Sequence, residues 1–100
     1  MNKIKHYAES IDEELDGAKE YIETALEYKV RGDAQRYNRY KEMSSQELTH
    51  ANSLHEFAVQ DIDELKRVVP DIPQEMLDKW EHAHKEFVEK AAWIRQMHAM

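Results

Sequence analysis

The 100-residue chain contains no cysteine, only two glycines and only two prolines. Without cysteine it can form no disulfide, no thiolate zinc site and no iron–sulfur cluster, so any metal has to be held by carboxylate or imidazole groups. Glycine and proline are the usual helix breakers, and their scarcity predicts long, uninterrupted helices. The chain also lacks the run of about 18 apolar residues that a membrane span requires.

Basic residues are outnumbered, because 14 Lys and Arg stand against 21 Asp and Glu and give a formal net charge of −7. Sequence-independent binding to the phosphate backbone of a nucleic acid requires an excess of Lys and Arg, so we expect no nucleic-acid partner. The first six residues lack the apolar core of a secretory signal, and the absence of cysteine fits a reducing compartment. We therefore expect a cytoplasmic protein with no membrane partner.

Apolar residues recur at spacings of three and four, which predicts an all-α fold in one domain that spans residues 1–100. Gly32 provides a left-handed helix stop and Asp33 the next N-cap, so the first two helices form an antiparallel hairpin. Pro70 and Pro73 force a second connection, after which a third helix begins. The predicted helices cover about residues 2–31, 34–68 and 73–99.

Such long helices in so short a chain leave apolar stripes that their own neighbours cannot fully cover. A partner subunit would cover them. We therefore expect a homodimer or a larger homo-oligomer.

The second predicted helix contains the pair Glu47-Leu-Thr-His50, and Glu14 on the first helix lies level with it. Glu14 stands eighteen residues before Gly32 and His50 eighteen after it, so each lies about 27 Å from the bend at 1.5 Å rise per residue. Both ligand-bearing segments also fall within the apolar stripes of their helices. The sequence predicts that Glu14, Glu47 and His50 converge.

Burying a carboxylate without a partner costs several kcal/mol, and the usual resolutions are pairing, metal coordination or a shifted pKa. Carboxylate oxygen and imidazole nitrogen suit iron or manganese, with zinc also possible. The alternative is that Glu14 reaches water, Glu47 pairs with a Lys or Arg, and His50 is a hydrogen-bonded interior histidine. The bare Glu-x-x-His spacing does not decide between these readings.

Two segments within residues 7–66 resemble the metal-binding helices of rubrerythrins and related ferritin-like proteins. Glu14-Leu-Asp-Gly-Ala-Lys-Glu-Tyr21 is similar to the first helix of that family, and Glu47-Leu-Thr-His50 followed by alanine is similar to the second. The resemblance implies that Glu14 is a terminal ligand, Glu47 bridges two metal ions, His50 supplies a nitrogen ligand, and Tyr21 is a phenol nearby. The rubredoxin-like cysteine module and the fourth helix of rubrerythrins have no counterpart here.

The resemblance implies a ferritin-like four-helix bundle completed by homodimerisation. In this the chain is also similar to encapsulated ferritins, whose short chains build the metal site at a dimer interface. Two hairpins supply four Glu and two His, the ligand set of a carboxylate-bridged dinuclear site. The implied cofactor is two iron ions per site. The implied activity is that of a ferroxidase or a peroxide-consuming oxidoreductase, acting on ferrous iron with dioxygen or peroxide.

A second Glu-x-x-His pair, Glu81 and His84, lies in the third predicted helix. It could complete the site within one chain or form a solvated flank, and we prefer completion by a second copy. The rival function is that of a metal-free helical-bundle interaction or assembly protein, whereas a zinc hydrolase is disfavoured by the absence of His-Glu-x-x-His. We expect the remaining histidines to be surface or packing residues: His6, His55, His82 and His98.

Overall fold

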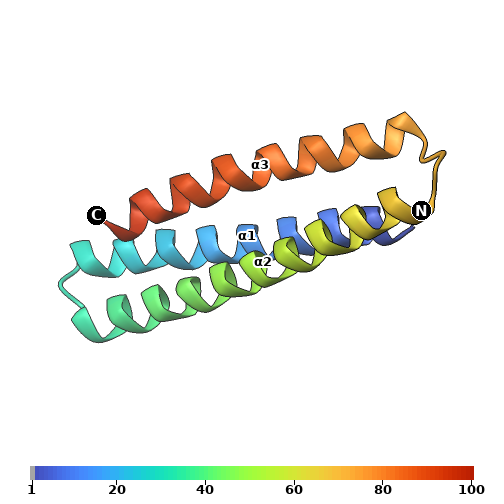
Figure 1. Cartoon of the computed structure of the whole chain (residues 1–100). Coiled ribbons are helices and arrows are strands. Elements are labelled where there is room, and N and C mark those ends of the chain that lie inside the picture. Colours follow the sequence, from blue (N-terminus) through green and yellow to red (C-terminus); the bar gives the residue numbers. More distant parts are fainter. Residues whose placement is uncertain (1) are drawn as a thin grey trace.

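A computed structural model describes residues 2–100, and this range contains three α-helices and no strand (Figure 1). The prediction of an all-α chain with three helices is confirmed, and each helix end lies within one residue of its expected position. Among these residues, no helix has both the length and the apolar character that crossing a membrane requires. The helices are α1 (Asn2–Val30), α2 (Ala34–Val68) and α3 (Gln74–His98).

The turn between α1 and α2 is built as its sequence predicts. Gly32 has a φ of 77°, a left-handed conformation that costs glycine little. The Asp33 side chain accepts a hydrogen bond of 3.0 Å from the backbone N–H of Arg36 and so caps the first turn of α2. This cap satisfies one of the donors that every helix start leaves open.

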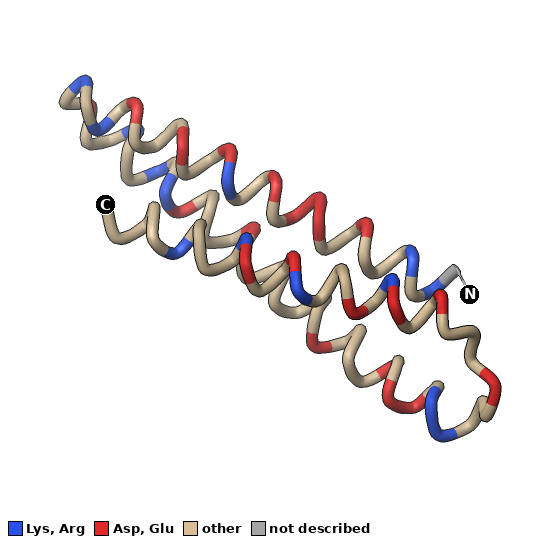
Figure 2. Tube along the Cα trace, turned by 90° about the horizontal axis from the view of Figure 1, so that it is seen from above, with Lys and Arg blue, Asp and Glu red and all other residues tan. Residues whose placement is uncertain are grey.

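The three helices form an elongated bundle of 57 × 18 × 16 Å in which α1 is the central helix. α2 runs antiparallel to α1 over nearly its whole length, and α3 returns parallel to α1, with few contacts to α2 (Figure 1). Acidic residues are spread along all three helices rather than gathered in one patch (Figure 2). The shape leaves much of each helix exposed, as expected for a chain of this length.

The core is a stripe on α1 that packs against small residues of α2 and against the second half of α3. Ala51 and Ala58 of α2 let its backbone approach α1 closely, and apart from Ile62 the larger buried side chains come from the other two helices. Burial of each large aliphatic side chain stabilises the fold by about 1.5–3 kcal/mol. The buried apolar residues are Ile4, Ile11, Leu15, Ala18, Ile22, Ala25, Ala51, Ala58, Ile62, Phe87, Ala91, Ile94 and Met97.

Two polar contacts hold α3 in place beside the hairpin. Lys90 donates to Asp12 at 2.5 Å and lies 3.5 Å from a second α1 carboxylate. The fully buried Ser44 of α2 donates its hydroxyl to the backbone carbonyl of Ala18 at 2.6 Å and lies 2.9 Å from Nε2 of His98. Ser44 therefore joins all three helices.

Candidate metal centre

Glu14 of α1 and the Glu47 and His50 side chains of α2 meet at one level of the hairpin. Each offers one ligand atom, and these three atoms lie within 4.8 Å of one another. Oε2 of Glu14 is 3.5 Å from Nδ1 of His50. The structure thus brings together the three residues that the register about Gly32 predicts.

The carboxyl groups in this cluster lack ordinary partners. Oε2 of Glu14 is buried and has no hydrogen-bond partner among residues 2–100. Within the same range, no Lys or Arg forms an ion pair with Glu14 or Glu47. A buried polar atom without a hydrogen-bond partner is unusual in a native structure and marks Glu14 as a candidate ligand.

The Glu14 carboxyl perturbs that of Glu47. A hydrogen-bonding interaction with Glu14, then partial burial, then repulsion from the Glu14 charge raise the pKa of Glu47, and His50 opposes the shift. Two carboxylates this close repel each other when both are ionised, and a shared proton or a bound cation relieves that repulsion.

Gly17, one turn after Glu14, gives the Glu47 carboxyl its space. A Cβ at this position would lie 3.4 Å from Oε2 of Glu47, and larger side chains would reach into the cluster. Glycine inside a helix costs about 0.5–1 kcal/mol relative to alanine. The role of Gly17 was not predicted from the sequence, although a glycine in mid-helix, one turn after a candidate ligand, could have indicated it.

The cluster faces away from α3. Asp12, which binds Lys90 of α3, lies two residues before Glu14 and therefore about 160° around α1. His55, which contacts α3 rings, lies five residues after His50 and therefore about 140° around α2. α3 covers one flank of the hairpin, and the metal-ligand cluster lies on the other.

The second Glu-x-x-His pair does not join this cluster. Nδ1 of His84 lies 2.7 Å from Nε2 of His55, and Glu81 is exposed on the same helix. Completion of the site by α3 of the same chain is therefore not formed in the structure. Tyr21 lies two turns from Glu14, where its ring is 6.2 Å from that of Tyr40, so it belongs to an aromatic cluster.

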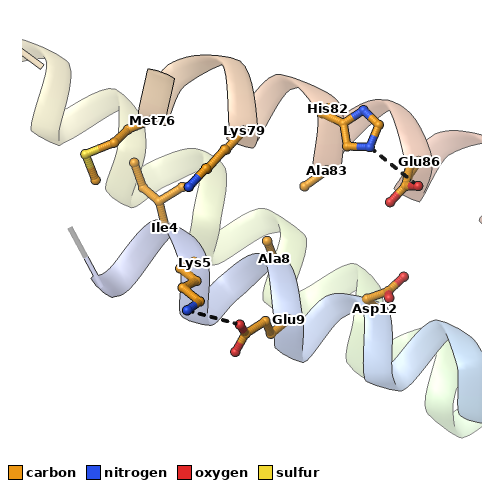
Figure 3. Close-up of a pocket in the computed structure, with 10 residues that line it drawn as sticks. All are labelled: Ile4, Lys5, Ala8, Glu9, Asp12, Met76, Lys79, His82, Ala83 and Glu86. Atoms are coloured by element: carbon orange, nitrogen blue, oxygen red, sulfur yellow. Dashed lines mark ion pairs between the residues drawn. The ribbon is translucent and has the colours of Figure 1, made fainter. Parts of the chain in front are cut away.

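A groove of about 420 Å³ between α1 and α3 contains none of the three clustered ligands (Figure 3). Its floor is apolar, with Ile4, Ala8 and Ala83. Its rim carries an ion pair of 3.6 Å between His82 and Glu86, so His82 is a surface residue as predicted.

Comparisons with protein-family models, with curated proteins and with solved structures found no significant match to this chain. Any functional assignment therefore rests on the site itself. Two carboxylates and one imidazole form a donor set that suits iron, manganese or zinc. The unpartnered oxygen of Glu14 is placed among these donors, so the residues present fit a metal ion.

Proposed function

We propose that Glu14, Glu47 and His50 form one half of a carboxylate-bridged dinuclear iron centre, and that a second copy of the chain supplies the other half. The protein is then a ferritin-like di-iron protein with ferroxidase or peroxide-consuming activity. The observation that carries the proposal is the convergence of three ligand atoms within 4.8 Å around a buried carboxylate oxygen that has no partner.

The exposure of the cluster supports completion by a second copy. The side chain of His50 is 60% exposed although its ring points toward Glu14. Leu54 and Phe57 lie seven residues after Glu47 and His50, on the same face of α2; Leu54 is partly buried and Phe57 is 54% exposed. A twofold axis through this face would cover these apolar groups and double the ligands to four Glu and two His.

The carboxylates of the cluster and the negative net charge of the chain both favour the binding of cations. Glu14 and Glu47 would hold the ions, and a bound cation would relieve the repulsion that contributes to the raised pKa of Glu47. The net charge of −7 favours the approach of ferrous ions, by an amount that falls with salt. Two ferrous ions oxidised to ferric would supply two electrons, enough to reduce one dioxygen with two protons to hydrogen peroxide, or one hydrogen peroxide with two protons to two waters.

Iron oxidation provides the direct test. The purified protein is loaded anaerobically with ferrous iron and exposed to air, and the near-ultraviolet absorbance of ferric products is followed. Fast oxidation of two irons per dimer is expected for the wild type and for Glu42→Gln, whose carboxylate is exposed and pairs with Arg39 at 3.2 Å on the same helix. Glu47→Gln should lose it. Equal oxidation in Glu47→Gln would overturn the assignment.

Oligomeric state tests completion of the site by a second copy. Sedimentation velocity of the wild type should show a dimer whose dissociation constant falls when metal is bound, because each copy contributes ligands to both ions. The Glu47→Gln dimer should not respond to metal. A monomer at all concentrations, with and without metal, would refute a shared site.

The second candidate function is that of a metal-free helical-bundle interaction or assembly protein. It is favoured by large apolar side chains that α3 and the ends of the hairpin leave exposed, such as Trp93 at 56% and Val68 at 69%. Absence of iron uptake by both wild type and Glu47→Gln would favour this function over the di-iron one.

A further inference from the structure

His55 of α2 and His84 of α3 form a pair on the opposite flank of the hairpin from Glu14. Nε2 of His55 lies 2.7 Å from Nδ1 of His84. The His55 ring lies almost parallel to that of Phe87, with centroids 4.2 Å apart and an angle of 9°, and its centroid is 5.7 Å from that of Trp80. Two aromatic rings of α3 thus fix the orientation of one imidazole while its nitrogen faces another.

A groove of about 370 Å³ opens beside this pair, and Glu81 lies along it. Glu81 stands one turn before His84 on α3, a spacing that places two side chains on the same side of a helix. Glu81 therefore lies on the same side of α3 as His84, but in the structure its carboxylate is not close enough to the two imidazoles to form a ligand cluster with them. The groove is lined by Lys66, Gln74, Leu77, Trp80, Glu81 and His84.

We infer that His55, His84 and Glu81 bind one divalent transition-metal ion, separately from the Glu14 cluster. Two nitrogens bound tetrahedrally to zinc at about 2.0–2.1 Å each lie about 3.3 Å apart, so the 2.7 Å pair has to open by only about 0.6 Å. Glu81 provides the third ligand by a side-chain rotation, and the groove leaves a fourth position to water. Such a His₂Glu set with an open position suits zinc and its neighbours nickel, cobalt and copper.

The position of the ion has a structural consequence, because α3 touches α2 at few points. A metal bound by His55 and His84 ties α3 to α2 and raises the stability of the folded chain.

The test uses a chain in which the other cluster has been removed. In Glu14→Gln/Glu47→Gln, freed of any affinity tag, zinc titration by calorimetry at neutral pH should show one ion per chain. Loss of an outer partner of a metal ligand already weakens binding by about 10–100-fold, so adding His84→Gln or His55→Gln should weaken it at least about tenfold. His82→Gln, which changes an exposed histidine on α3 that pairs with Glu86, is the matched control and should leave binding unchanged.

Electron paramagnetic resonance of the same background variant with one equivalent of cupric ion needs no further substitution. Coupling of the copper electron spin to two imidazole nitrogens supports the site, and coupling to one or none overturns it. In the calorimetry, the proposal is also overturned if the background variant binds no zinc, or if zinc binding survives both His55→Gln and His84→Gln. Because the Glu14 cluster is absent from this variant, these outcomes do not depend on the proposed di-iron function.

Discussion

Replacing Glu47 by glutamine should stabilise the metal-free protein at neutral and mildly alkaline pH. Glutamine keeps the shape of the side chain, removes its negative charge and offers an N–H₂ donor to the unpartnered oxygen of Glu14. Most substitutions destabilise a protein. A gain in stability here would therefore show that the cluster is strained without a cation.

The expected size follows from the separation of the charges. Two like charges no more than 4.8 Å apart repel by at least about 0.9 kcal/mol in bulk water and about 3.5 kcal/mol at an effective dielectric of about 20. The side chains of Glu14 and His50 are 28% and 60% exposed, so solvent screens much of this repulsion. We expect Glu47→Gln to raise the free energy of unfolding by about 1 kcal/mol.

The gain should depend on pH with a definite sign. The pKa of Glu47 is raised in the folded state, so folding binds its proton more tightly, and the stability that this contributes is present below the unfolded pKa. It is lost as pH rises through the higher folded pKa. The advantage of Glu47→Gln over wild type should therefore be small in acid and should grow as pH rises through that window.

Urea denaturation in excess chelator, at an acidic and a mildly alkaline pH, measures both effects. Glu42→Gln is the matched control, and its change should stay within about 0.5 kcal/mol because the side chain is exposed. A Glu47→Gln variant that is less stable than wild type in alkaline chelator, or equally shifted at both pH values, would refute the account of a repulsive pair.

Three further substitutions test the packing around the site and α3. Gly17→Ala should raise the free energy of unfolding, measured by urea denaturation, by about 0.5–1 kcal/mol, because the added methyl fits 3.4 Å from the Glu47 carboxyl and alanine is the better helix former. A lower free energy of unfolding would show that a methyl group does not fit beside Glu47. Ser44→Ala should lower the free energy of unfolding by about 1–3 kcal/mol, since it removes the hydroxyl that donates to the buried Ala18 carbonyl and contacts the partly buried Nε2 of His98. An unchanged urea midpoint would show that Ser44 does not hold the three helices together. Lys90→Met should lower the free energy of unfolding by about 0.5–1 kcal/mol at low salt and by less at high salt, because the ion pair between Lys90 and Asp12 is partly exposed. A decrease that does not depend on salt would show that Lys90 stabilises the fold by packing rather than by its charge.

The helices could be predicted from the sequence because their ends are marked by few and unambiguous residues. Gly32 takes the left-handed conformation, Asp33 caps α2, and Pro73 directly precedes α3. Between these positions nothing interrupts the spacing of apolar residues. Local chemistry alone therefore decides where each helix begins and ends.

The level of the Glu14 cluster was predictable for a different reason. In two antiparallel helices joined by a short turn, each residue adds the same rise along the bundle axis. Residues that are equally many positions from Gly32 therefore lie at the same level. The sequence could not indicate that one oxygen of Glu14 is left without a hydrogen-bond partner or how far the Glu47 carboxyl lies from Gly17. Those facts depend on the angle at which the helices cross, which apolar spacing does not specify.

The placement of α3 could not be predicted at all. Apolar periodicity shows that a helix has a face to bury, but not which flank of the hairpin that face will cover. For this reason Glu81 and His84 remained open between a metal site and a solvated flank. His55 was expected at the surface or in packing; its ring packs against that of Phe87, and the contact of 2.7 Å with the nitrogen of His84 depends on where α3 lies.

The two Glu-x-x-His pairs have the same spacing, and the chemistry proposed for each is decided by the residue opposite. Glu47 and His50 meet Glu14, which adds a second carboxylate, so that two acids come close enough for a cation to relieve their repulsion. His84 meets the imidazole of His55, which adds a nitrogen instead of an oxygen to the proposed donor set. Because the ligands from α2 lie about 140° apart around that helix, one ion cannot reach both clusters. The same short motif therefore enters two proposed sites with different donor sets, and neither site follows from the motif alone.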